Sequence, residues 1–197
     1  MHIEEVGPDG LARYATIPMA FEVNTILNVK PIQNGLGGLA LHQEPVATPY
    51  IKDYDAQEDG DPQILPERFG VENWGFFLAI DNNLPTGGAI VTHNTSGINL
   101  LEDRNDLAIL WDIRVHPDAK RKNIGTQLFT HCANWAREQN CSQLKIETQN
   151  INVPACHFYA KQGCQLVQID QFAYQNTPEV AHEIMLVWHY DINEGTK

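Results

Sequence analysis

Short runs of apolar and β-branched residues, separated by turn-forming residues, recur along this chain and predict a sheet with few helices. Such runs bounded by Gly, Pro and Asn are typical of strands. They cover residues 21–32, 39–42, 74–81, 87–93, 107–115, 144–148, 166–170 and 183–190. One segment has helical spacing instead, with apolar residues at Ile124, Leu128, Cys132 and Trp135. A second helix is expected between Pro154, near its start, and Gly163, at its end.

The order of these elements predicts an α/β sandwich with a mixed, mostly antiparallel sheet. The turn residues at 34–38 join the first two strands into a hairpin. Residues 45–54 are expected to be irregular or briefly helical, and residues 53–67 form an acidic surface loop. We interpret 1–197 as a single domain, with the hairpin and acidic loop in residues 1–70 and the core in 71–190.

The composition is that of a globular protein without a membrane segment. Hydrophobic residues make up 43% of the chain, enough for a core, and no apolar run has the length of a membrane span. Because the first residues are acidic rather than signal-like, we predict a cytoplasmic protein. Its four cysteines form no Cys-x-x-Cys pair, so we expect reduced thiols and no metal site.

The charge balance limits the partners of the protein. Asp and Glu number 25 against 13 Lys and Arg, which gives a formal net charge of −12. Such a surface repels nucleic acid and anionic membranes, so we expect neither as a partner. It would attract a cationic substrate, although a solvated acidic surface that only maintains solubility remains an alternative.

A basic turn stands out against this acidic background. Lys120, Arg121 and Lys122 follow the apolar strand that ends at Val115 and precede the helix expected from Ile124. The first backbone N–H groups of a helix have no intrahelical acceptor, and the helix dipole favours an anion there. The turn therefore predicts a site for a polyanion such as a diphosphate. By itself, it is also compatible with solvated lysines on an ordinary strand–turn–helix.

A second motif downstream identifies the ligand class. Residues 152–163 read N-x-x-A-x-x-F-Y-x-x-x-G, and together with the basic turn they resemble the GCN5-related N-acetyltransferases, or GNAT family. The family pattern in the turn is Arg or Gln, two residues, Gly, any residue, and Gly or Ala. Lys120 stands for the Arg and Gly125 for the last Gly, whereas Asn123 replaces the first Gly. Asn tolerates left-handed backbone better than most residues.

The resemblance implies acetyl-CoA as co-substrate, with its pyrophosphate at the basic turn and its pantetheine arm along the preceding, splayed strand. The pantetheine contacts would fall on the backbone of Ile113 and Val115, one of which would polarise the thioester carbonyl. Asn152 and Ala155 would line the coenzyme. The resemblance thus implies the following coenzyme-binding residues: Ile113, Arg114, Val115, Lys120, Arg121, Lys122, Asn123, Ile124, Gly125, Thr126, Asn152, Ala155 and Tyr159.

Three residues are candidates for proton transfer. An attacking amine must lose a proton, and Asp112 and Glu147 are carboxylates within otherwise apolar strands, where an unpaired charge is costly. Each could instead face solvent or pair with Arg114 or Lys145. The resemblance assigns protonation of the departing thiolate to Tyr159, although an aromatic pair on a helix is otherwise typical of core packing.

The segments 110–113, 146–152, 155–159 and 186–190, together with 20–23 and 49–54 upstream, are similar to those of streptothricin acetyltransferases. The similarity is strong over residues 107–190 and patchy before them. This similarity implies acetylation of a primary amine on a cationic small molecule. The alternatives are a protein N-terminal or lysine N-acetyltransferase and a non-catalytic acyl-CoA-binding sensor. By family analogy the chain would form a homodimer.

Overall fold

The structure is a computed structural model that describes residues 1–57 and 59–193. The chain forms two compact units, each built from separate stretches of sequence. Unit 1 comprises residues 1–20, 53–146 and 189–197, and unit 2 comprises residues 21–52 and 147–188. No helix in the described part of the chain is long and apolar enough to cross a membrane.

Unit 1 is built on a mostly antiparallel sheet in which β1, β4, β5 and β6 lie in this order, followed by the first part of β7 and the end of β9. Antiparallel pairs join β1 to β4, β4 to β5 and β5 to β6, whereas β6 and β7 run parallel. The strands are β1 (His2–Val6), β4 (Trp74–Asp81), β5 (Leu84–His93) and β6 (Leu107–Val115). Two more strands are shared with unit 2: β7 (Gln143–Gln149) begins in unit 1, and β9 (Met185–Asp191) ends in it. This sheet confirms the predicted fold class.

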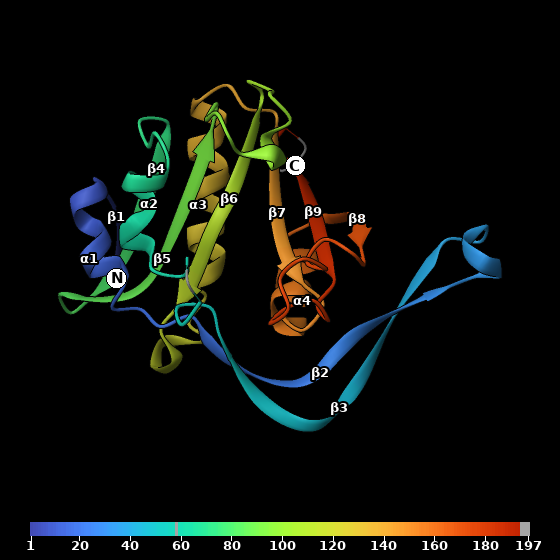
Figure 1. The fold of residues 1–197 in the computed structure, drawn as a ribbon. Coiled ribbons are helices and arrows are strands. Elements are labelled where there is room, and N and C mark those ends of the chain that lie inside the picture. Colours follow the sequence, from blue (N-terminus) through green and yellow to red (C-terminus); the bar gives the residue numbers. More distant parts are fainter. Residues whose placement is uncertain (58, 194–197) are drawn as a thin grey trace. The chain divides into compact units, whose positions relative to one another are not determined.

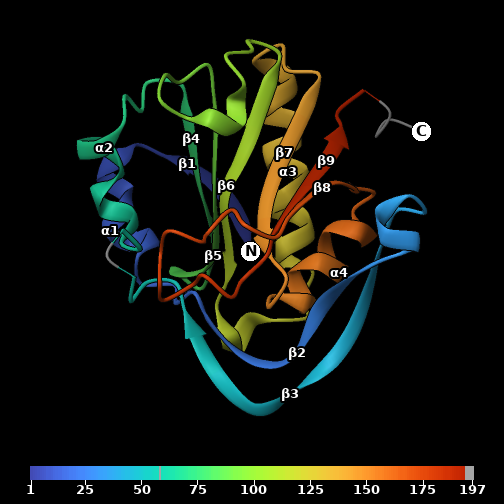
Figure 2. The same ribbon diagram turned by 45° about the vertical axis from the view of Figure 1, so that its right-hand side comes forward.

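Helices cover both faces of the unit 1 sheet (Figure 2). The long helix α3 (Ile124–Glu138) lies on one face, and the short helices α1 (Leu11–Tyr14) and α2 (Leu65–Arg68) lie on the other. Two adjacent glycines of β5 allow this close packing. A Cβ on Gly87 would lie 2.8 Å from Ile124 Cγ2, and one on Gly88 would lie 2.4 Å from Tyr14 Cε2. Both residues therefore need a hydrogen in place of a side chain.

The first twenty residues belong to the core of unit 1. Strand β1 pairs with β4 along its whole length, and Leu11, Tyr14 and Ile17 are buried against Phe76 and other apolar residues of the sheet. The sequence had suggested no element before residue 21, because the segment is short and mixes charges with apolar residues. Tertiary packing decides its structure.

The shorter 3-10 segments are η1 (Pro8–Gly10), η3 (Pro62–Ile64), η4 (Asn99–Leu101) and η5 (Pro117–Ala119).

Unit 2 contains a long twisted hairpin of β2 (Ala20–Pro31) and β3 (Leu39–Asp53) (Figure 1). Its turn includes η2 (Gln33–Gly35), so the predicted hairpin is confirmed. The expectation that residues 45–54 are irregular was wrong, since β3 continues to Asp53. Pro45 and Pro49 are compatible with a strand here because each strand of a two-stranded ribbon has a free edge, which needs no N–H donor.

The rest of unit 2 follows the strand–helix–strand–strand order expected from the sequence. The end of β7 leads into α4 (Val153–Lys161), which is followed by β8 (Gln165–Asp170) and then β9, with the strand order β7-β9-β8. Pro154 lies in the first turn of α4, and Gly163 follows the helix with a φ of 89°, as predicted. A buried ion pair between Lys52 Nζ and Glu183 Oε1, 2.5 Å long, joins β3 to the loop before β9.

Candidate functional site

The basic turn of unit 1 has the geometry of an anion-binding loop. Strand β6 ends at Val115, η5 follows, and α3 begins at Ile124. Asn123 is left-handed, with φ 64° and ψ 15°, as is Arg121 with φ 64°. The backbone thus takes the conformation that the glycine of the family pattern would favour, with asparagine in its place.

The turn presents donors and positive charge without competing partners. Within the described residues, no oxygen accepts a hydrogen bond from the backbone amides of residues 121–125. Lys120, Arg121 and Lys122 are exposed, and none of them forms an ion pair in the part of the chain that the structure describes. Free amides at a helix N-terminus beside unpaired cations fit a diphosphate group.

Strand β6 carries the residues expected to contact the pantetheine arm. Ile113 and Val115 pair with Ala89 and Gly87 of β5, which fixes their backbone. The register between these strands shifts at Trp111, since Ile90 faces Asp112 and Val91 faces Leu110. Such a β-bulge bends a strand and redirects the side chains next to it.

Asp112 lies in a buried ion pair next to this bulge. The Arg114 guanidinium donates to Asp112 Oδ2 from Nη2 at 2.5 Å and from Nε at 2.9 Å. Arg114 Nη1 also donates to Asp55 Oδ1 and to the Ile17 carbonyl, both at 2.9 Å. The guanidinium lies over the Tyr14 ring, 4.9 Å from its centroid. The structure therefore has the Arg114 pairing that the sequence left open for Asp112.

Burial dominates the electrostatics of this cluster. It raises the pKa of Asp112, an effect that the Arg114 charge opposes. Burial also raises the pKa of Tyr14, and the Asp112 charge adds to this effect. Asp112 Oδ1 and the Tyr14 hydroxyl are both buried, and an interaction between these two side chains raises the pKa of Tyr14 further while lowering that of Asp112. The Arg114 side chain is committed to this cluster, so only its backbone is available to a coenzyme.

The second candidate base, Glu147, has a different environment in unit 2. It is exposed, and its Oε1 accepts a hydrogen bond of 2.7 Å from the Tyr174 hydroxyl. Gln149 Nε2 donates to the Tyr174 hydroxyl oxygen at 2.8 Å and lies 3.5 Å from Glu147 Oε1. Sequence reasoning missed Tyr174 because it lies in a loop 27 residues away, where no local pattern relates it to Glu147.

The downstream motif, residues 152–163, spans the whole of α4 in unit 2. Asn152 caps the helix, since its Oδ1 accepts a hydrogen bond of 3.2 Å from the Ala155 amide. This cap is a structural reason for asparagine at the first motif position. Tyr159 lies four residues after Ala155, about one helical turn, and is 5% exposed. The centroid of its ring lies 5.3 Å from that of Phe158 and 6.4 Å from that of Trp188.

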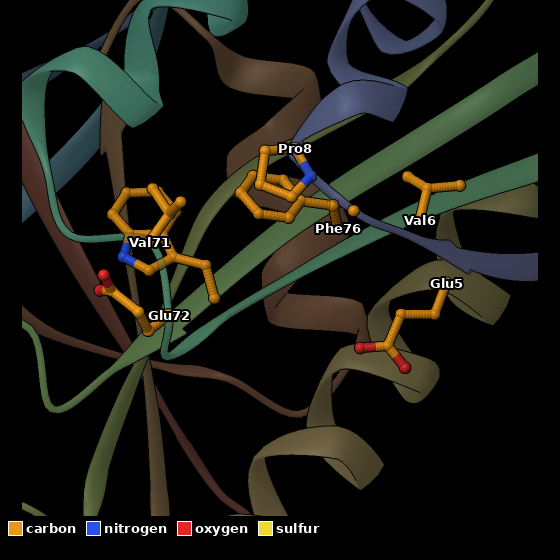
Figure 3. A pocket seen from close by; sticks show the side chains of 8 residues that line it. Glu5, Val6, Pro8, Val71, Glu72 and Phe76 are labelled. Carbon is orange, nitrogen blue, oxygen red and sulfur yellow. The ribbon is translucent and has the colours of Figure 1, made fainter.

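A shallow hollow lies elsewhere on unit 1, with a volume of about 620 Å³. Its lining includes Glu5, Pro8, Glu72 and Phe76 but none of the predicted site residues. Figure 3 shows Glu72 on the left and Glu5 on the right of this view of the hollow. We therefore do not connect this hollow with catalysis.

The described residues contain no cluster of three or more His, Cys, Asp or Glu side chains able to hold a metal ion. The four cysteines are buried free thiols. Burial raises the pKa of Cys156 to about 11 and that of Cys164 to about 12, which makes both thiols poor nucleophiles at neutral pH.

This fold and the basic turn are those of an acetyltransferase. The family model for the acetyltransferase (GNAT) family matches residues 41–164, more than half of the chain, so the protein belongs to this family. Streptothricin acetyltransferase A of Bacillus subtilis (strain 168) is 34% identical over 148 residues, which cover 75% of this chain and 77% of that protein. Streptothricin acetyltransferase of Escherichia coli is 30% identical over 144 residues, covering 73% and 71%.

Solved structures agree in fold. A nourseothricin acetyltransferase matches with a TM-score of 0.73 and 22% identity over 97% of this chain and 98% of its own. A protein from Bacillus anthracis str. Ames, assigned as a streptothricin acetyltransferase and solved in complex with acetyl coenzyme A, matches with a TM-score of 0.73 and 24% identity, covering 96% of each chain.

Proposed function

We propose that this acetyltransferase moves the acetyl group of acetyl-CoA to a primary amine of a cationic small molecule, with streptothricin as the leading candidate. The observation that carries the substrate class is the identity of 34% and 30% to two streptothricin acetyltransferases over most of each chain. The net charge of −12 supports it, because an acidic surface attracts a polyamine.

The acetyl-CoA assignment rests on the basic turn. We infer that the free amides of residues 121–125 and the side chains of Lys120, Arg121 and Lys122 hold the pyrophosphate. Ile113 and Val115 would offer backbone groups to the pantetheine arm. In unit 2, Asn152, Ala155 and Tyr159 are assigned to the coenzyme by the family motif alone.

We infer that Glu147, rather than Asp112, takes the proton from the substrate amine. An amine with a pKa near ~10.4 is almost entirely protonated at neutral pH, so a proton acceptor is needed. Glu147 is exposed and hydrogen-bonded to a neutral hydroxyl, whereas Asp112 is buried and paired with Arg114. Tyr159 would return a proton to the departing thiolate.

We further propose that both units belong to one catalytic domain, since the family model covers segments of each. The excess of acidic residues disfavours nucleic-acid or membrane partners, and the cytoplasmic location is kept as a proposal. A homodimer is proposed on family analogy alone.

The coenzyme site is tested by acetyl-CoA binding in K120A/R121A. We expect a weaker affinity than in the wild type and a smaller loss of affinity on adding salt, because charges that salt would screen are gone. Lys161→Ala, which removes a cation on α4, is the control and should bind as the wild type does. Unchanged affinity of K120A/R121A would mean that the pyrophosphate binds elsewhere.

The substrate is tested by thiol release from acetyl-CoA with streptothricin, free lysine, other small amines and basic peptides. We expect the fastest turnover with streptothricin. A preference for peptides would favour the alternative of a protein acetyltransferase. Tyr159→Phe should lower kcat while leaving acetyl-CoA affinity largely intact, and an unchanged kcat would exclude Tyr159 as the proton donor.

A further inference from the structure

Tyr174 lies in the loop between β8 and β9 of unit 2, outside both family motifs. Its side chain is half-buried, and its hydroxyl donates to Glu147 Oε1 at 2.7 Å. This hydrogen bond links a loop residue to the carboxylate that we propose as the base, 27 residues away in the sequence.

The hydrogen-bond directions in this cluster are fixed by chemistry. Gln149 Nε2 can only donate, and it donates to the Tyr174 oxygen at 2.8 Å. The Tyr174 proton must then point away from Gln149, toward Glu147. Gln149 and Glu147 are two residues apart on β7, so their side chains lie on the same face of the strand. The strand thus holds both partners of the hydroxyl.

This arrangement occupies one oxygen of Glu147 and leaves the other available. Oε1 accepts the bond from Tyr174, whereas Oε2 has no hydrogen-bond partner among the described residues. An exposed glutamate otherwise samples several rotamers, and ordering it costs conformational entropy. A carboxylate already held through Oε1 presents Oε2 in one direction.

The charge of the hydrogen-bond partner distinguishes Glu147 from Asp112. Asp112 is neutralised by the Arg114 cation, but the Tyr174 hydroxyl carries no charge. The Tyr174 hydroxyl therefore restrains the orientation of Glu147 without placing a cation beside it. A neutral donor restrains the base without competing with the substrate for it.

We propose that Tyr174 is a positioning residue, which orients Glu147 so that its free oxygen accepts the proton of the substrate ammonium group. This inference rests on the proposed role of Glu147. Tyr174 itself transfers no proton in the reaction. The proton passes from the amine nitrogen to Glu147 Oε2, and the nitrogen lone pair then attacks the acetyl carbonyl.

The test is a double-mutant cycle with Tyr174→Phe and Glu147→Gln, assayed with the amine that the wild type acetylates fastest in the substrate panel. Because a hydrogen bond to a charged group is involved, we expect Y174F to lower kcat/KM for the amine about ten- to hundredfold. The KM for acetyl-CoA should not change. In the E147Q background, the same substitution should change kcat/KM less than about threefold, since the amide of Gln still accepts a hydrogen bond but cannot act as the base that Tyr174 orients.

Tyr190→Phe is the matched control, because this tyrosine packs edge-on against Phe129 in unit 1 and is assigned no role in the site. An equal loss from Y174F in both backgrounds would overturn the positioning role, as would wild-type kinetics of Y174F. Wild-type activity of E147Q would instead overturn Glu147 as the base. Absence of turnover with every amine would refute both proposals, whereas failure of streptothricin alone would refute only the substrate.

Discussion

Replacing Arg114 with methionine tests whether the buried cluster around Asp112 stabilises unit 1. The substitution keeps much of the side-chain volume and removes the charge. It breaks the bonds to Asp112 and Asp55 and leaves the Ile17 carbonyl without its donor. Removing one member of a buried ion pair typically costs about 3–5 kcal/mol. We expect a loss in this range in the free energy of unfolding at pH 7.

The loss should depend on pH in a defined direction. Burial raises the pKa of Asp112 and Arg114 lowers it, so R114M raises this pKa further in the folded state. In the unfolded chain Asp112 is ionised above about pH 4, so the folded variant binds a proton that the unfolded variant releases. Its stability therefore falls as pH rises, by up to ~1.4 kcal/mol per unit. The difference from the wild type should be larger at pH 8 than at pH 5.

Urea unfolding followed by circular dichroism between pH 5 and pH 8 measures both effects. Arg104→Met is the matched control, because Arg104 forms a similar bidentate pair with Asp106 but remains 34% exposed. Exposed pairs contribute about 0–1 kcal/mol. If R114M costs no more than R104M, or if its cost does not grow with pH, the reasoning about the buried cluster is refuted.

Two further predictions concern the backbone. Because Asn123 has φ 64°, Asn123→Gly should preserve acetyl-CoA affinity, whereas Asn123→Val should weaken it and cost about 1–2 kcal/mol of stability. Equal affinities and equal unfolding free energies of the two variants, measured by calorimetry, would argue against the left-handed cap. Gly88→Ala should cost about 1–3 kcal/mol, since its Cβ would lie 2.4 Å from the Tyr14 ring. In thermal melts Gly70→Ala, whose Cβ meets only the flexible Glu72 carboxylate, is the control, and a similar loss in both would contradict the packing argument.

Local patterns predicted much of the fold. The bounds of β4 and β6 agree with the apolar runs at 74–81 and 107–115, because buried strands leave a continuous apolar signature. The prediction for residues 45–54 was wrong because this part of β3 has no such apolar signature. It contains two prolines, and its mostly exposed side chains do not alternate between apolar and polar as in a half-buried strand.

The candidate site likewise has features that the sequence predicted and others that depend on tertiary contacts. The sequence by itself determined the basic turn, the α4 motif and the two candidate carboxylates, because helix ends, caps and charges are encoded by neighbouring residues. Only the tertiary structure decided that Asp112 is paired with Arg114 and Asp55, while Glu147 is exposed and bonded to Tyr174. Asp55 is 59 residues from Arg114, and Tyr174 is 27 from Glu147. The chemistry of a carboxylate depends on neighbours in space, which no local pattern specifies.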